Sequence, residues 1–165
     1  MSPGLQSRAL AGLTSWVCAA LPITRGTSWL DLDAASVSTA YIVDDEACIR
    51  NALRRLLNMY GIVVKVYASA ETFLVDAEHL RDGCLLLDIN MPGLTGIELL
   101  GQLSSKNWHL PTVLMTAVVD GSLREKATKA GAFALLEKPF HVDVLLSTME
   151  QAVIQHRSKA DADTG

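Results

Sequence analysis

Residues 84–93 read CLLLDINMPG, and the rest of the chain can be interpreted around this segment. An uncharged run of four residues leads into Asp88, and Pro92 and Gly93 follow shortly after it. A short apolar run bounded by turn residues predicts a strand that is buried on both faces. Because Pro92 and Gly93 favour a turn, the strand is expected to end before them. Asp88 would then lie at the carboxyl end of a buried strand, where open α/β sheets bind their ligands.

The composition is that of an ordinary globular chain. Its 165 residues are 50% hydrophobic, which is enough for one domain whose core needs no disulfides. The net charge is −4 and there is no long basic run, so nucleic-acid binding is not expected as the main function. With 5% aromatic residues, platforms for base stacking are not expected either. No segment has the length of a membrane span.

The cysteines indicate a reducing compartment. Cys18, Cys48 and Cys84 are odd in number, far apart and without CxxC spacing, so neither a disulfide framework nor a zinc site is predicted. Cys48 and Cys84 lie in apolar contexts and are interpreted as small buried hydrophobic residues. We expect a cytoplasmic protein.

Residues 1–38 differ in composition from the rest of the chain. They combine Ser, Thr, Gly and Pro with short apolar patches and carry few charges. Residues 9–23 faintly resemble the core of a signal peptide, but Pro22 and the lack of an Ala-x-Ala motif argue against cleavage. We expect a poorly ordered extension or an upstream translation start, to which we assign no function, then one domain over 39–157 and a polar tail over 158–165.

From Thr39 onward the pattern predicts five strands alternating with five helices. Short apolar or β-branched runs indicate the strands, and apolar residues at helical spacing indicate the helices. Ser69 is a helix N-cap by type, and Thr95 and Glu98 have capping-box spacing. The expected strands are 40–43, 62–67, 84–88, 111–116 and 133–136, and the expected helices are 49–60, 69–77, 95–103, 123–130 and 142–153.

This alternation predicts an α/β fold, a doubly wound parallel sheet with helices on both faces. Right-handed crossovers favour the flavodoxin-like (βα)5 arrangement with strand order 2-1-3-4-5. The first and third strands are then neighbours. The acidic residues at their ends, Asp44, Asp45 and Asp88, would meet at the switch point of the sheet.

Carboxylates that converge in this way repel one another unless a cation lies between them. Oxygen ligands suit a hard divalent ion such as a partly hydrated Mg²⁺. Thr116 and Lys138 end the fourth and fifth strands and bring a hydroxyl group and a positive charge to the same edge. Together with an aspartate nucleophile, these groups suit phosphoryl transfer to Asp88.

Each residue also has a plainer interpretation. Asp88 could be a turn former, Asp45 could cap the first helix, and Lys138 could form a surface ion pair. Thr116 could be an ordinary strand residue. Five such residues at four strand ends of one sheet favour the joint interpretation over these separate ones.

Several short motifs occur in a fixed order along residues 41–155. They are VDDE at 43–46, LDINMPG at 87–93, TA at 116–117 and EKPF at 137–140. In type, order and spacing they resemble the receiver domain of two-component response regulators. Two further segments are similar to receivers usually joined to a LuxR-type helix-turn-helix domain: SAETFL at 69–74 and KAGA at 129–132.

The resemblance implies a role for each residue. Asp88 would be the phosphoacceptor, charged by a histidine kinase or a histidine phosphotransfer protein. Thr116 and Lys138 would bind the phosphoryl group, and the Lys138–Pro139 bond is expected to be cis. Such a protein catalyses its own phosphorylation and slow dephosphorylation but is not a conventional enzyme. The Mg²⁺ ligands would be Asp44, Asp45, Asp88 and the backbone carbonyl of Asn90.

The chain departs from the family pattern at two places. Receivers commonly carry an aromatic residue three positions before the lysine, where this chain has Leu135, so the aromatic form of the switch is absent. No DNA-binding domain follows the last helix before Gly165, so we expect either a stand-alone receiver without its own DNA-binding domain or a receiver whose effector domain has been removed. By the same resemblance, the side chains two residues beyond the phosphoacceptor and two beyond the threonine flank the path of the hydrolytic water. Here Asn90 could orient a water but Val118 cannot hydrogen-bond one, which predicts slow loss of the phosphoryl group.

The expected partners are proteins. Arg50, Arg54 and Arg55 are predicted on the exposed side of the first helix, where the family docks its phosphodonor, although a merely solvated helix face is an equal alternative. The face of the fourth and fifth helices is the family's usual surface for a homodimer or an effector protein. No nucleic acid is expected to bind this chain alone, and no membrane.

Two rival functions stay open beside the signalling switch. One is a phosphate sink, a receiver with an intact pocket and no output. The other is a phosphatase with an aspartate nucleophile, which would want a second acid two residues after the first, where Asn90 stands.

Overall fold

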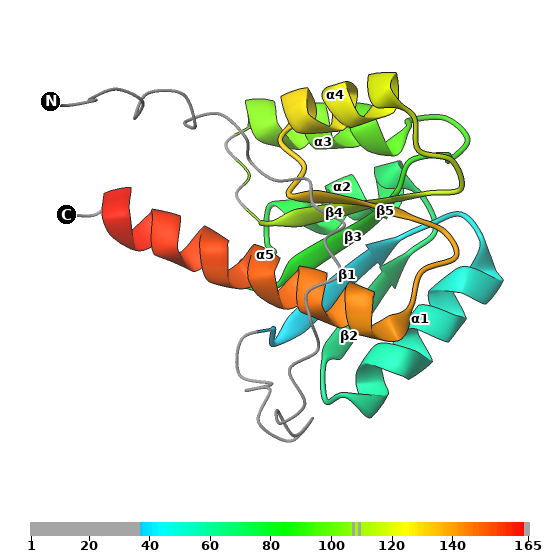
Figure 1. Cartoon of the computed structure of the whole chain (residues 1–165), viewed down its shortest axis with the longest axis horizontal. Coiled ribbons are helices and arrows are strands. Elements are labelled where there is room, and N and C mark those ends of the chain that lie inside the picture. The colour runs from blue at the N-terminus through cyan, green and yellow to red at the C-terminus, as the bar shows by residue number, and fades with distance from the viewer. Residues whose placement is uncertain (1–36, 107, 109, 164–165) are drawn as a thin grey trace, which may run out of the picture. The chain divides into compact units, whose positions relative to one another are not determined.

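The computed structural model describes residues 37–106, 108 and 110–163 (Figure 1). Nearly all of the predicted N-terminal extension therefore lies outside the described residues. Strands and helices alternate in the described region, as predicted. They are β1 (Thr39–Val43), α1 (Ala47–Met59), β2 (Val63–Tyr67), α2 (Ala70–Ala77), β3 (Cys84–Asp88), α3 (Gly96–Ser105), β4 (Thr112–Thr116), α4 (Gly121–Ala130), β5 (Ala134–Glu137) and α5 (Val142–Asp163).

The strands form one parallel sheet in the order β2-β1-β3-β4-β5, which confirms the predicted topology. Helices α1 and α5 cover one face, and α3 and α4 lie on the other (Figure 1). Every residue of β3 and β4 is buried, because both strands are covered on both faces. This explains why they read as unbroken apolar runs rather than as alternating patterns.

The core between the sheet and the α1–α5 layer is built from side chains at helical and strand spacing. Leu53 and Leu57 of α1 and Leu145 and Met149 of α5 meet Ile42 and other strand residues in one buried cluster. Burial of these aliphatic side chains is the main term that favours the fold. The sheet is thereby held rigid beneath the loops at its carboxyl edge.

The loops that follow β2, β3 and β4 are fixed by helix caps. Ser69 and Thr72 form a capping box at α2, and Thr95 and Glu98 form one at α3, where Glu98 Oε2 accepts a hydrogen bond from Thr95 N at 2.9 Å. Both N-caps were predicted from the sequence and are confirmed. Asp120 caps α4 by accepting a hydrogen bond from Leu123 N at 2.7 Å.

Two details differ from the sequence analysis. Cys48 is exposed on the first turn of α1, so its prediction as a buried residue was wrong, whereas Cys84 is buried as predicted. The last helix extends to Asp163, so much of the polar segment that begins at Ser158 is helical. In the part of the chain that the structure describes, no helix is long and apolar enough to cross a membrane.

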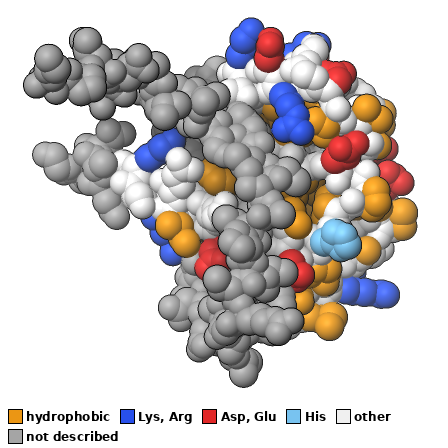
Figure 2. Space-filling view, in the orientation of Figure 1, with side chains coloured by type: hydrophobic (Ala, Val, Ile, Leu, Met, Phe, Trp, Pro, Cys, Tyr) orange, Lys and Arg blue, Asp and Glu red, His pale blue; other side chains and the backbone are white. Residues whose placement is uncertain are grey.

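The surface seen in Figure 2 mixes charges of both signs. Acidic and basic side chains stand close together over the α3–α4 layer at the top of the view (Figure 2).

Candidate functional site

An ion-paired cluster lies at the carboxyl edge of the sheet, where β1, β3 and β5 end. Asp44 follows β1, Asp88 ends β3, and Lys138 follows β5. Lys138 Nζ lies 2.8 Å from Asp88 Oδ1 and 2.9 Å from Asp44 Oδ2. The parallel topology, which brings these strand ends together, therefore joins three of the residues that the sequence singled out.

The cluster holds more negative than positive charge. Burial raises the pKa of Asp88 most, the hydrogen bond and charge of Lys138 lower it, and the charges of Asp44 and Asp45 raise it again, leaving it above its ordinary value. Burial opposes the charged form of Lys138, but hydrogen bonds to Asp88 and Asp44 outweigh this and raise its pKa. Both groups therefore hold their protons more tightly, Asp88 mainly because it is buried and Lys138 because two carboxylates accept its hydrogen bonds.

Asp44 is fixed through all of its acceptor atoms. Its side chain is fully buried, Oδ1 accepts a hydrogen bond from Glu46 N at 2.8 Å, and Oδ2 accepts one from Lys138. Its backbone carbonyl accepts a hydrogen bond from Arg50 Nη1 at 2.6 Å. Asp45 is exposed at the mouth of the cluster. Asp44 is thus a rigid acid, and Asp45 is the freer one.

The donor set fits a partly hydrated Mg²⁺. Among the described residues, no three Asp, Glu, His or Cys side chains are already gathered as a metal cage. However, Mg²⁺ needs only one or two carboxylates and keeps several waters. Asp44 and Asp88 supply buried carboxylates, and the charge of Asp45 acts on Asp88. The residues present therefore suit such an ion.

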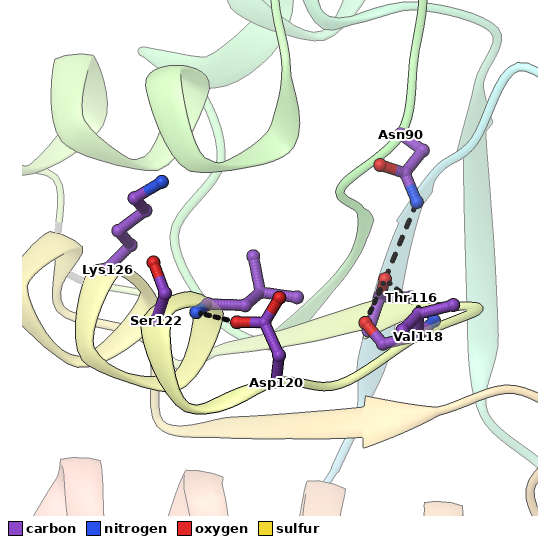
Figure 3. Close-up of a pocket in the computed structure, with 7 residues that line it drawn as sticks. Asn90, Thr116, Val118, Asp120, Ser122 and Lys126 are labelled. Carbon is purple, nitrogen blue, oxygen red and sulfur yellow. Dashed lines mark hydrogen bonds between the residues drawn. The ribbon is translucent and has the colours of Figure 1, made fainter.

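Thr116 lies at the same edge but faces a different direction. Its side chain is buried, and its hydroxyl donates a hydrogen bond to the carbonyl oxygen of Val118 at 3.1 Å. Asn90 Nδ2 donates to Thr116 Oγ1 at 3.5 Å (Figure 3). The hydroxyl is therefore turned toward Asn90 and the loop after β4, and no hydrogen bond joins it to the Asp44–Asp88–Lys138 cluster.

A pocket begins at this pair of residues and continues along α4. Its volume is about 380 Å³, and Figure 3 shows Asn90 and Thr116 at one end and Lys126 at the other. The walls are Asn90, Thr116, Val118, Asp120, Ser122, Leu123 and Lys126. Nothing in the sequence pattern separates Ser122 and Lys126 from ordinary helix residues, and the sequence analysis did not find them.

Two other residues that support the cluster were missed or misplaced by the sequence analysis. A Cβ atom on Gly96 would collide with the backbone carbonyl of Asp88, so only glycine allows α3 to start against β3. Arg50 was predicted on the exposed helix face, but it is half-buried and bonded to Asp44, whereas Arg54 and Arg55 are exposed as predicted. The Lys138–Pro139 bond is cis, which confirms the prediction.

Leu135 lies within β5, opposite Leu114 of β4. Its side chain is 8% exposed. The position where receivers commonly carry an aromatic side chain is therefore filled by a buried leucine that points away from solvent.

The family model and the relatives that this chain matches indicate the same family, the response regulators. Residues 40–150 match the family model of the response regulator receiver domain. The chain is 39% identical over 125 residues to the transcriptional regulatory protein FixJ of Rhizobium meliloti (strain 1021), covering 76% of this chain and 61% of that protein. It is 35% identical over 126 residues to the transcriptional regulatory protein TdiR of Thauera aromatica, covering 76% of this chain and 56% of that protein.

Solved structures agree with the sequence matches. The crystal structure of FixJ-N aligns with a TM-score of 0.66 at 39% identity, covering 70% of this chain and 92% of that one. The chemotaxis protein CheY4 of Vibrio cholerae aligns with a TM-score of 0.66 at 25% identity, covering 70% and 98%. Because the chain spans only about 60% of the FixJ protein's length, the expectation that no DNA-binding domain follows it stays a prediction.

Proposed function

Because the chain belongs to the response regulator receiver family, we propose that it is a phosphoacceptor switch that is phosphorylated on Asp88. The phosphoryl group would come from the phosphohistidine of a histidine kinase or a histidine phosphotransfer protein. The observation that supports this most directly is the contact of one ammonium group with two buried carboxylates, Lys138 with Asp88 and Asp44, at the ligand-binding edge of the sheet.

In the proposed reaction, a carboxylate oxygen of Asp88 attacks phosphorus and the donor nitrogen leaves with the bonding electron pair. The attacking group is the carboxylate form of Asp88, and its neighbour Asp44 is held by hydrogen bonds, so the protein acts mainly by positioning and by charge stabilisation. The ammonium group of Lys138, which pairs with the Asp88 carboxylate, can then pair with the new phosphoryl oxygens. Its contact with Asp44 keeps the ammonium group in place during this transfer.

A bound Mg²⁺ would neutralise charge on the phosphoryl oxygens. We propose that Asp44, Asp45, Asp88 and the backbone carbonyl of Asn90 hold it. Asp44 is fixed by its hydrogen bonds from Glu46 N and Lys138, so it is suited to orient a metal-bound water. Asp45, exposed at the mouth, can bind from the solvent side.

Thr116 is proposed to bind the phosphoryl group after a change of hydroxyl orientation. Its hydroxyl now donates to the Val118 carbonyl, a neutral hydrogen bond. A phosphoryl oxygen is a stronger, charged acceptor, so a hydroxyl within reach would exchange partners. Release of Val118 would free the loop before α4, which is one route from Asp88 to the surface of the α4 and α5 face. Leu135 of β5 is already buried in the starting state.

We propose two surfaces for protein partners. The phosphodonor would dock beside the exposed Arg54 and Arg55 of α1. The face of α4, β5 and α5 would bind a second copy of the chain or an effector protein. We propose a cytoplasmic location, because histidine kinases phosphorylate receivers there.

Acetyl phosphate tests the proposal without knowledge of the kinase. Native protein should gain one phosphoryl group by intact mass in the presence of Mg²⁺ and none after chelation of the metal. Asp88→Asn, which keeps the shape of the side chain, should gain none. If native protein stays unmodified, or if Asp88→Asn is modified equally, phosphorylation of Asp88 is not the function.

A further inference from the structure

The pocket along α4 adjoins the phosphorylation site, and the proposed function leaves its far end unexplained. Asn90 and Thr116 belong both to the site edge and to the pocket wall (Figure 3). In an in-line transfer the leaving group departs on the side of phosphorus opposite to the attacking oxygen. A leaving group larger than a few atoms therefore needs space outside the Asp88 cluster, and this pocket begins at the same edge of the sheet, at Asn90 and Thr116.

The chemistry of the pocket changes along its length. Two aliphatic side chains belong to its wall: Val118, which is 66% exposed and lies beside Thr116 in Figure 3, and Leu123. At the far end, Ser122 and Lys126 lie one turn apart on α4. Among the residues that the structure describes, neither side chain has a hydrogen-bond or ion-pair partner. The pocket is thus polar for most of its lining, with two aliphatic side chains in its wall and a hydroxyl donor and an ammonium group at its far end.

Asp120 is the one acidic side chain of the pocket wall. One of its oxygens accepts the capping hydrogen bond from Leu123 N at 2.7 Å. Its charge weakens the attraction of the pocket for an anion, while the hydrogen bond from Leu123 N holds the carboxylate at the start of α4.

We propose that this pocket binds the leaving group of small acyl phosphates and prefers an acyl group with an apolar body and a distal carboxylate. The inference rests on the proposed phosphorylation of Asp88 and names a class of direct phosphodonor. The Asp88 oxygen forms a bond to phosphorus, the bond between phosphorus and the acyl oxygen breaks, and the carboxylate leaves with the electron pair. The distal carboxylate would contact Lys126 and Ser122.

A matched pair of donors tests this directly. Benzoyl phosphate and 4-carboxybenzoyl phosphate share the reacting group and the ring and differ only in the distal carboxylate. We expect native protein to react about fivefold faster with the carboxylated donor at subsaturating concentration, as one exposed ion pair allows. Lys126→Gln should abolish this preference and leave the rate with benzoyl phosphate unchanged.

Two further variants separate the pocket from the general charge of the helix. Lys129→Gln removes the same charge from α4 outside the pocket and should keep the preference. Asp120→Asn retains a capping side chain and removes the opposing charge, so it should increase the preference. The inference is overturned if native protein has no preference, or if Lys126→Gln and Lys129→Gln reduce it equally. If acetyl phosphate phosphorylates the protein and neither benzoyl donor does, the inference is overturned and the proposed function stands; if acetyl phosphate fails as well, the proposed function itself fails.

Discussion

Replacing Lys138 by Met is expected to destabilise the fold, and to do so most strongly at neutral and alkaline pH. The Lys138 side chain is 19% exposed and contacts Asp88 and Asp44 at 2.8 and 2.9 Å. Removing it leaves two buried carboxylates without a cation. Breaking a buried pair in this way costs about 3–5 kcal/mol. We expect about 2 kcal/mol here, because the cluster lies at the solvent-facing edge of the sheet.

The pH dependence of this loss follows from Asp88. Its pKa is raised, mainly by burial, so the native state binds more protons than the unfolded state above the ordinary carboxyl pKa of about 4. Ionisation of Asp88 therefore destabilises the fold as pH rises through this range. Without Lys138, which lowers the pKa of Asp88, that penalty grows. The loss should be larger at about pH 8 than at about pH 5.

Urea denaturation followed by circular dichroism measures the free energy of unfolding at both pH values. Lys65→Met, which removes an exposed lysine from β2, is the matched control and should change stability by about 0.5 kcal/mol or less. Adding Mg²⁺ should stabilise Lys138→Met more than native protein. A loss as small as that of the control, or one that does not depend on pH, would refute the reasoning.

Three further changes probe the site. Gly96→Ala should cost about 1–3 kcal/mol of unfolding free energy, because its Cβ would meet the Asp88 carbonyl, whereas Gly101→Ala on the same helix meets nothing within 4 Å and should stabilise. Val118→Gln should speed loss of the phosphoryl group, measured by mass after donor removal, by a factor on the order of ten, because Gln can orient water. A native half-life as short as that of the fastest-cycling receivers would contradict this. Thr116→Ala should slow phosphorylation by acetyl phosphate on the order of a hundredfold, and an unchanged rate would remove Thr116 from the proposed mechanism.

The fold could be predicted because each element carries its own signal. The unbroken apolar run before Asp88 marks a strand covered on both faces, and β3 is buried throughout. Once the alternation of strands and helices fixes a parallel sheet, strand ends meet at one edge. Asp44, Asp88 and Lys138 could then be brought together from sequence position alone.

The features that could not be predicted depend on the orientation or exposure of single side chains. Cys48 begins a helix, where one residue of offset exchanges a buried for an exposed position. Arg50 donates a hydrogen bond to the backbone carbonyl of Asp44, and because every residue has a backbone carbonyl, the sequence does not indicate this contact. The Thr116 hydroxyl chooses between partners on either side of it. Ser122 and Lys126 could not be identified from the sequence because only the pocket in the structure distinguishes them from other helix residues.

The measurement that tests the central claim most directly is chemical trapping of the phosphoryl group. Protein treated with acetyl phosphate and Mg²⁺ is reduced with borohydride, which converts an aspartyl phosphate to homoserine, and the peptides are sequenced by mass spectrometry. We expect homoserine at position 88 and nowhere else, and none when Mg²⁺ is chelated. Homoserine at another acidic position, or its absence from residue 88 in protein that has gained the phosphoryl mass, would contradict the account.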